Sequence, residues 1–170
     1  MKYILDFDHT LFNTSLFGQK ASAYEERGTK ITSAIWDIFD ATSFLYDDTL
    51  DFLKKVGKDN VVILTAIKPS LGVHAREFQE TKLEKSGVRT FVDDIIFMEG
   101  EKGSYVKDLY ANVPTLFLDD TLEQLQSVRR VCPDVTTVQM VRPLLEHRGP
   151  ISTSKDIAVV TSLADVSQMV

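Results

Sequence analysis

The sequence predicts an α/β fold, a doubly wound Rossmann-like parallel sheet with helices on both faces. Two observations predict it. Short apolar, β-rich runs alternate along the chain with longer stretches whose apolar residues recur at helical spacing. One of these runs, residues 60–66 (NVVILTA), lacks polar alternation, which indicates a strand covered on both faces. Because 170 residues that are 44% hydrophobic can bury a sizeable core, we expect a single domain spanning residues 1–170.

The first part of the chain is expected to be one strand followed by a small helical insertion. Residues 3–5 (YIL) are apolar and partly β-branched, so they predict a buried strand. Residues 13–58 follow it and should be mostly helical, with Trp36 packed among them. Within this insertion we predict a loop at 13–19, a short helix at 20–27 ended by Gly28, helical spacing from 31 to 39, and a helix at 49–58 with Gly57 near its end.

The remainder of the chain alternates predicted strands with predicted helices. After residues 60–66, the further strands are expected at 94–98, 115–118, 135–141 and 157–160. The helices between and after them are expected at 69–86, 104–110, 122–131 and 163–170, with 142–154 irregular.

Composition limits the classes of function. The net charge of −6 and a pI near 5.0 argue against nucleic-acid binding as the main activity. A small phosphorylated substrate is compatible with this charge, because only the local field of a pocket acts on it. Residues 1–12 lack the basic start and long apolar core of a signal peptide, and no apolar run reaches the roughly 20 residues that span a bilayer. We therefore expect a soluble, cytoplasmic protein that binds no membrane.

Chemically active side chains follow four of the predicted strands. In a doubly wound sheet, ligands bind beyond the carboxyl ends of the strands, so these side chains should converge. Two carboxylates held close together repel each other, and a fold that keeps them adjacent usually supplies a cation; hard oxygen ligands suit Mg²⁺, which would bridge them to a phosphate. The residues are Asp6 and Asp8 after the first strand, Thr65 in the second, Lys102 in a predicted loop after the third, flanked by Gly100 and Gly103, and Asp119 and Asp120 after the fourth.

This pattern resembles the four motifs of the haloacid dehalogenase-like superfamily, in its phosphatase type. The matching segments are DFDHT at 6–10, ILTA at 63–66, Lys102, and LFLDD at 116–120, in the expected order. The resemblance implies that Asp6 attacks phosphorus and forms an aspartyl-phosphate, and that Asp8 protonates the leaving oxygen and then activates water. An acid at Asp8 fits a phosphatase or a phosphotransferase, because dehalogenases of the superfamily lack it.

The resemblance also implies binding roles. Asp6, the backbone carbonyl of Asp8, and Asp119 would hold Mg²⁺, with Asp120 positioning Lys102 or a metal-bound water. The metal set expected from the sequence is therefore Asp6, Asp8, Asp119 and Asp120. Thr65 and the amide of Ala66 would bind the phosphate, and Lys102 would neutralise charge on the nucleophile and on the transferred group.

One position departs from the family pattern, and one assignment has rivals. His9 stands where many members carry glycine, and we interpret it mainly as a turn residue. Lys82 and Lys85 are alternatives to Lys102, but their segment, EFQETKLEKSG, indicates a solvated helical face. We therefore favour Lys102.

The leading hypothesis is a Mg²⁺-dependent phosphomonoesterase whose substrate the sequence does not name. A phosphotransferase or mutase using the same aspartyl-phosphate, a receiver-like signalling domain, and a non-catalytic protein on the same fold are the alternatives. Residues 13–58 are too short for a large separate cap, so any lid should be small and helical. Such an open site suits either a bulky substrate or closure by a partner subunit in a homo-oligomer.

Overall fold

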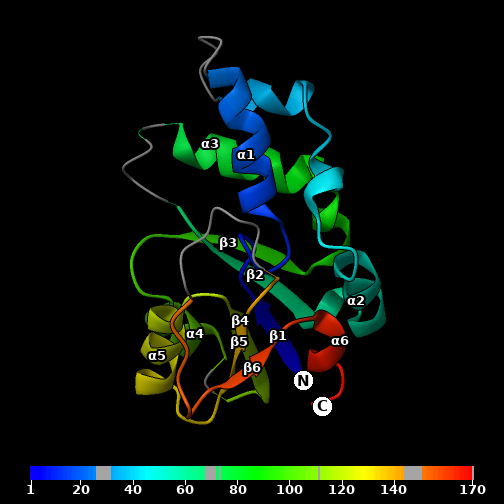
Figure 1. The fold of residues 1–170 in the computed structure, drawn as a ribbon. Helices are drawn as coiled ribbons and strands as arrows, with labels where there is room; N and C mark the ends of the chain where they lie inside the picture. The colour runs from blue at the N-terminus through cyan, green and yellow to red at the C-terminus, as the bar shows by residue number, and fades with distance from the viewer. Residues whose placement is uncertain (26–31, 68–71, 73, 111, 144–150, 170) are drawn as a thin grey trace.

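A six-stranded parallel sheet forms the centre of the computed structural model, which describes residues 1–25, 32–67, 72, 74–110, 112–143 and 151–169 (Figure 1). The strand order is β3-β2-β1-β4-β5-β6, with all neighbours parallel. The strands are β1 (Lys2–Leu5), β2 (Val61–Ala66), β3 (Asp94–Met98), β4 (Thr115–Asp119), β5 (Thr136–Met140) and β6 (Ala158–Val160). The predicted fold class is confirmed.

The sheet separates two hydrophobic cores. Successive side chains of a strand point to opposite faces, so Leu5 packs in one core and Ile4 in the other. The second core lies under α4 (Lys102–Tyr110) and α5 (Leu122–Val131), which pack against each other on that face. The first core lies under α2 (Thr49–Val56) and α6 (Leu163–Val166) and extends into the insertion. The unbroken apolar strands predicted from the sequence are thus covered on both faces.

The first part of the insertion lies over the carboxyl end of the sheet, together with α3 (Ala75–Lys85), whereas its last helix, α2, packs on the first core (Figure 1). The elements of this first part are α1 (Thr14–Glu25) and the 3₁₀ helices η1 (Ser33–Asp37) and η2 (Ala41–Phe44). Aromatic rings join it to α3: Phe17 stacks on Trp36 at 4.5 Å between centroids, and Phe78 of α3 lies 5.4 Å from Trp36. Trp36 is therefore a core residue, as predicted.

Some predicted boundaries are wrong. Residues 14–19 belong to α1 rather than to a loop, because the side chain of Asn13 accepts a hydrogen bond from the Leu16 amide at 3.0 Å and so starts the helix. In the segment 31–39, where helical spacing was predicted, the structure has only the short 3₁₀ helix η1 (Ser33–Asp37). Ile38, which follows this helix, is 54% exposed. Lys102 is the first residue of α4 and does not lie in a loop.

Other boundaries are confirmed. β3 and α5 have the predicted bounds, and Gly57 ends α2 with a φ of 86° that favours glycine.

Two helices are shorter than predicted: α3 begins only at Ala75, and α6 ends at Val166, before the predicted end of that helix. The predicted helix end at Gly28, the predicted helix start near 69 and part of the irregular segment 142–154 lie outside the described residues.

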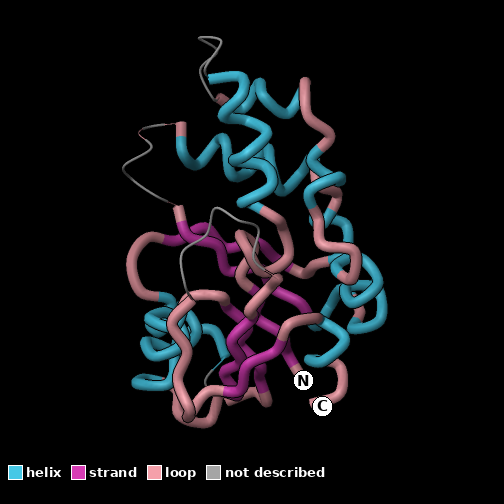
Figure 2. The backbone as a smooth tube through the Cα atoms, in the orientation of Figure 1, coloured by secondary structure: helices cyan, strands magenta, loops and turns pink. Residues whose placement is uncertain are grey.

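The chain's two ends lie near each other at the amino end of the sheet, opposite the insertion (Figure 2). The short 3₁₀ helices η3 (Lys58–Asn60) and η5 (Val88–Phe91) precede β2 and β3. Among the described helices, none combines the length and the apolar composition needed to cross a membrane.

Candidate active site

Asp6 and Asp119 meet because β1 and β4 are neighbours in register. Leu5 pairs with Leu118, and the Asp6 amide donates to the Leu118 carbonyl at 2.9 Å, so the next residue of each strand carries its carboxylate to the same edge. Lys102 Nζ lies between them, 2.6 Å from Asp6 Oδ1 and 2.7 Å from Asp119 Oδ2. All three side chains are buried, where charges must be paired.

Lys102 is held in place by α5. Its backbone amide donates to Gln124 Oε1 at 2.8 Å, and the amide of Gly103 donates to Ser127 Oγ at 3.1 Å. A Cβ at Gly103 would collide with the backbone carbonyl of Ser127. The glycine that the sequence suggested as part of a loop instead allows α4 to approach α5 closely, which points Lys102 at the ends of β1 and β4.

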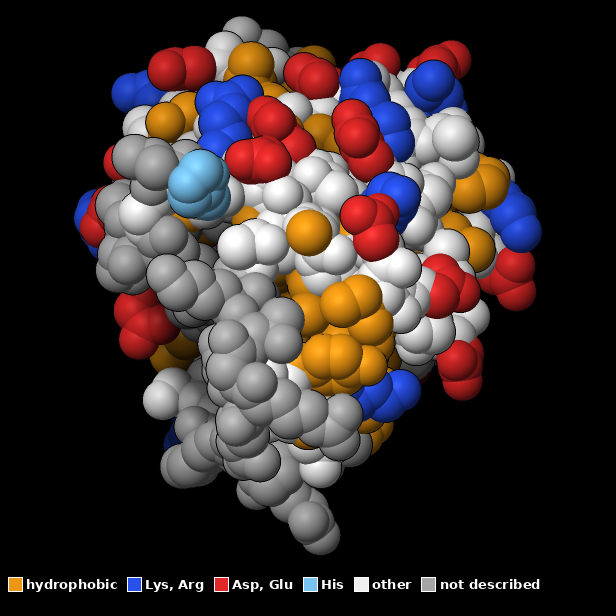
Figure 3. All heavy atoms as spheres, turned by 90° about the horizontal axis from the view of Figure 1, so that it is seen from above, with side chains coloured by type: hydrophobic (Ala, Val, Ile, Leu, Met, Phe, Trp, Pro, Cys, Tyr) orange, Lys and Arg blue, Asp and Glu red, His pale blue; other side chains and the backbone are white. Residues whose placement is uncertain are grey.

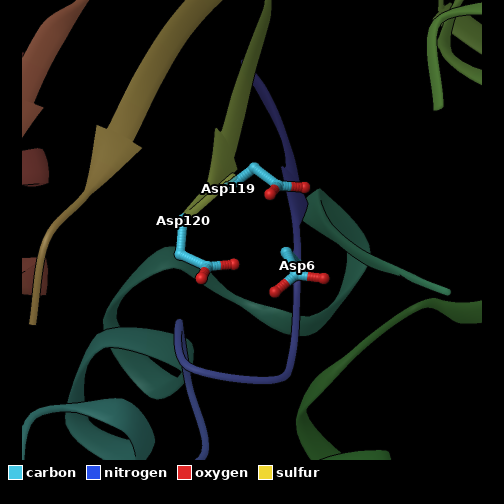
Figure 4. Close-up of side chains that lie close together, drawn as sticks. All are labelled: Asp6, Asp119 and Asp120. Carbon is cyan, nitrogen blue, oxygen red and sulfur yellow. The ribbon is translucent and has the colours of Figure 1, made fainter. Parts of the chain in front are cut away.

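Asp120 completes a cluster of three buried carboxylates with Asp6 and Asp119. One oxygen from each lies within 4.8 Å of the others, and all three point toward a common space (Figure 4). Among the described residues, Asp6 Oδ2 is buried without a hydrogen-bond partner. Lys102 shares one ammonium between the carboxylates of Asp6 and Asp119, so this pair carries more negative charge than its lysine neutralises. The hard oxygen donors of the cluster and the unpaired Oδ2 fit a divalent cation such as Mg²⁺.

The electrostatics of the cluster show the same imbalance. Burial raises the pKa of Asp6 well above its ordinary value; Lys102 opposes this shift, and Asp119 and Asp120 add to it. Burial likewise raises the pKa of Asp119 against the influence of Lys102. For Lys102, burial alone would lower the pKa, but Asp119 and Asp6 outweigh it and hold the pKa above its ordinary value. A bound cation would stabilise the ionised carboxylates.

Asp8 lies in a second network, which α3 supplies. Lys82 Nζ donates to Asp8 Oδ1 at 2.6 Å, and Gln79 Nε2 donates to Asp8 Oδ2 at 2.7 Å and to Thr65 Oγ1 at 2.8 Å. The hydroxyl of Thr14, at the start of α1, also donates to Asp8 Oδ1. Burial would raise the pKa of Asp8, but Lys82 and the hydrogen bonds from Lys82, Thr14 and Gln79 lower it to about 2.

The two networks face one cavity of about 470 Å³. All seven residues predicted from the sequence line it: Asp6, Asp8, Thr65, Ala66, Lys102, Asp119 and Asp120. The carboxylate of Asp8 lies with Lys82 and outside the three-carboxylate cluster, so its expected contribution to metal binding through the backbone carbonyl stays a prediction. The preference for Lys102 over its rivals agrees with its contacts to Asp6 and Asp119.

The sequence interpretation of Lys82 is wrong, while that of Lys85 is confirmed. Lys82 is 3% exposed, whereas Lys85 is exposed and lies 3.4 Å from Asp37. The missed signal is helical periodicity: Ala75, Gln79 and Lys82 share the spacing i, i+4, i+7, which places them on one face with the buried Leu83. Gln79 and Thr14 were not singled out by sequence reasoning.

His9 makes the turn that separates the two networks. Its φ of 62° lies in the left-handed region, which costs a non-glycine residue about 1 kcal/mol and explains why glycine suits this position. Around it, the His9 amide donates to the Phe12 carbonyl at 2.8 Å and the Leu11 amide donates to the Phe7 carbonyl at 2.9 Å. The turn interpretation is confirmed, and His9 also lines the cavity.

The surface around the insertion has no dominant sign of charge. Acidic and basic side chains are interspersed over the described part of the face seen from above the insertion (Figure 3). In the part of this face that the structure describes, neither sign of charge forms an extended patch.

Solved structures show which fold this is. No protein-family model and no curated protein sequence matches the chain. A protein from Burkholderia xenovorans described as a haloacid dehalogenase-like hydrolase matches with a TM-score of 0.69 at 17% identity, covering 99% of this chain and 97% of that one. A haloacid dehalogenase-like family hydrolase from Xanthomonas campestris matches with a TM-score of 0.62 at 14% identity, covering 99% and 96%.

L-2-haloacid dehalogenase from Xanthobacter autotrophicus matches with a TM-score of 0.59 at 13% identity, covering 99% of this chain and 97% of that one. These identities are too low to carry an activity from one protein to another, but the coverage is nearly complete. The chain therefore has the fold of the haloacid dehalogenase-like hydrolases, with a buried acidic cluster at the carboxyl end of its sheet.

Proposed function

We propose that the protein is a Mg²⁺-dependent phosphatase that hydrolyses a small phosphomonoester through an aspartyl-phosphate on Asp6. The observation that carries the proposal is the unpaired, buried Oδ2 of Asp6, beside two further carboxylates and one ammonium in a cavity. A nucleophilic oxygen, a cation site and a positive charge for the transferred group are the parts that phosphoryl transfer needs.

Asp6, Asp119 and Asp120, with the backbone carbonyl of Asp8, are the groups that would hold Mg²⁺. When bound, the ion would offset the negative charge of the carboxylates and of the phosphate. Lys102 opposes the rise in the pKa of Asp6 and so favours its ionised form, and it faces the same space, so it would also neutralise charge on the transferred phosphoryl group. Thr65 accepts a hydrogen bond from Gln79, which leaves its hydroxyl proton to donate to a phosphate oxygen, beside the amide of Ala66.

The reaction follows in two steps. A carboxylate oxygen of Asp6 attacks phosphorus and the bond to the leaving oxygen breaks, while Asp8, which must first take up a proton because its pKa before substrate binds is about 2, gives that proton to the leaving oxygen. Asp8, now a carboxylate, takes a proton from water as the water attacks the phosphorus of the aspartyl-phosphate. Inorganic phosphate leaves and both aspartates return to their starting states.

The cavity beyond Asp8 suits a small leaving group of mixed polarity. Ile67, Ala75 and Phe78 contribute apolar surface there, and His9 and Thr14 contribute polar groups. We propose a small phosphorylated molecule as the substrate and residues 13–58 as a small cap-like insertion, whose α1, η1 and η2 form a helical lid over it. We expect no nucleic-acid or membrane partner, and closure by a partner subunit is a further expectation that the oligomeric state would test.

The experiment is hydrolysis of an aryl phosphate with Mg²⁺ and with a chelator, in the wild type and in Asp6→Asn. Metal-dependent turnover that Asp6→Asn abolishes is the expected result, because the amide is isosteric but a poor nucleophile. Asp51→Asn is the matched control, since Asp51 is an exposed carboxylate on α2 that pairs only loosely with Lys54 at 3.7 Å. Near-normal hydrolysis by folded Asp6→Asn would contradict the mechanism.

The strand order disfavours one alternative function, the receiver-like domain, but not another, the phosphotransferase. A receiver-like domain has the strand order 2-1-3-4-5 and carries its phosphoacceptor on an interior third strand, whereas here β3 is an edge strand and the carboxylates follow β1 and β4. A phosphotransferase remains compatible with the same residues. Adding alcohol acceptors to the assay tests it, because transfer would yield a new phosphoester in place of inorganic phosphate.

A further inference from the structure

The buried face of α3 carries more polar groups than packing requires. Gln79 is 6% and Lys82 is 3% exposed, and both face the cavity rather than solvent. Burying an ammonium is strongly unfavourable unless it is paired and hydrogen-bonded. An apolar residue at either position would pack in the core without that cost, so the contacts of these two side chains need an explanation beyond folding.

Gln79 connects two residues of the proposed mechanism. A carboxylate can only accept hydrogen bonds, so the amide nitrogen of Gln79 must face Asp8 Oδ2. The same nitrogen donates to Thr65 Oγ1, and its two protons are thus divided between the end of β2 and the turn after β1. One side chain thereby sets the distance between the proposed phosphate-binding hydroxyl and the proposed general acid.

Lys82 holds the other oxygen of the same carboxylate. Its Nζ is 2.6 Å from Asp8 Oδ1 and lies over the rings of Phe7 at 5.4 Å, Phe12 at 5.2 Å and Phe78 at 5.9 Å. The ring faces attract the ammonium, which limits its alternative positions. With both carboxylate oxygens held, Asp8 cannot rotate freely. A carboxylate has about four acceptor positions, and the three donors leave one that can carry the proton for the leaving oxygen.

We propose that Gln79 and Lys82 are positioning residues that hold the general acid Asp8 and the phosphate-binding Thr65 in their productive arrangement. This inference rests on the proposed phosphatase function. It assigns α3 to the half of the reaction in which the leaving oxygen is protonated, whereas Lys102 and the acidic cluster serve the attack on phosphorus.

The test compares two phosphate esters that differ in their need for an acid. An aryl phosphate with an acidic phenol needs little protonation of its leaving oxygen, while an alkyl phosphate needs full protonation. Lys82→Met and Gln79→Met should lower kcat for the alkyl ester by about 10²-fold, the size of a general-acid contribution, and for the aryl ester by much less. A structural defect would lower both equally.

Lys85→Met is the matched control, because Lys85 lies on the same helix with an exposed ammonium. It should change neither ester by more than about twofold, in line with a solvated position. Lys82→Arg, which keeps the charge and the donors, should recover part of the alkyl ester activity; if Lys82→Met does not fold, Gln79→Met and Lys82→Arg carry the same comparison.

The outcomes separate this inference from the function on which it rests. Equal losses on both esters, or no loss on either, in folded Lys82→Met and Gln79→Met would overturn the positioning role while wild-type, Asp6-dependent turnover upheld the phosphatase. Absence of Asp6-dependent turnover of either ester by the wild type would overturn both.

Discussion

Two buried lysines each hold a carboxylate of the site, but they do so in different surroundings. Lys102 bridges Asp6 and Asp119, whose side chains are 9% and 1% exposed. Lys82 pairs with Asp8, whose side chain is 29% exposed. The first lysine neutralises part of a crowded acidic cluster, and the second forms a nearly balanced pair with access to water. The two halves of the site therefore differ in how much of the fold's stability depends on them.

Removing each ammonium gives the largest expected effect. Lys102→Met leaves Asp6 and Asp119 buried without the ammonium that pairs with both, and it should lower the free energy of unfolding by about 3–5 kcal/mol, the usual cost of breaking a buried ion pair. Lys82→Met should cost about 1–3 kcal/mol, because Asp8 reaches water and keeps two hydrogen bonds. Urea unfolding with chelator present measures both, and equal losses would contradict the difference between the halves.

The pH dependence of Asp8 sharpens the comparison. Its pKa in the folded protein is about 2, below the ordinary value of 3.8. A lowered pKa contributes stability that is present above pH 3.8 and is lost as the pH falls through about 2. Asp8→Asn should therefore lower stability by about 2 kcal/mol at neutral pH, and the difference from wild type should disappear toward pH 2. Unfolding curves at several pH values check this, and a pH-independent difference would contradict it.

Asp6 should behave in the opposite way. Its pKa is raised, so its contribution to stability is present below the ordinary value of 3.8 and is lost as the pH rises through the folded value. In metal-free protein at neutral pH, Asp6→Asn should raise stability by about 1 kcal/mol, because it removes one crowded carboxylate while Lys102 keeps Asp119. Thermal unfolding with chelator measures it, with Asp51→Asn as the control that should show no gain.

Mg²⁺ should make the wild type more stable than Asp6→Asn, the reverse of the order expected without metal. An ion that binds only the folded state stabilises it by RT ln(1 + [Mg²⁺]/Kd), so saturating Mg²⁺ should raise the Tm of the wild type by several degrees. The same addition should raise the Tm of Asp6→Asn less, because one ligand has lost its charge. An equal rise in both proteins would place the ion elsewhere.

The smallest expected effect belongs to the exposed lysine of α3. Lys85→Met breaks only a 3.4 Å surface pair with Asp37 and should change the free energy of unfolding by less than about 0.5 kcal/mol. Set beside Lys82→Met, three residues earlier, it isolates the effect of burial on one helix. A loss as large as that of Lys82→Met would mean that the helix, and not the contact with Asp8, explains the result.

The pattern of residues along the chain was enough to predict the sheet and the half of the site that the sheet carries. Apolar runs without polar alternation predict buried parallel strands, and parallel strands bring their carboxyl ends to one edge. Asp6, Thr65 and Asp119 lie at the carboxyl ends of three such apolar strands. That rule alone predicts that they lie close together, and the structure places all three around one cavity. Lys102 was also predicted from the sequence, although Lys102 and its neighbour Gly103 were expected in a loop and belong to α4.

The half of the site that α3 carries depends on long-range packing, which the pattern of residues does not specify. The rotation of a helix about its own axis depends on what packs against it, and here that partner is the insertion: Phe78 lies 6.1 Å from Phe17 and 5.4 Å from Trp36. These contacts turn Gln79 and Lys82 toward Asp8. Because the contacts join residues 42 to 61 positions apart, local periodicity could mark the buried face of α3 but could not say that it meets a carboxylate.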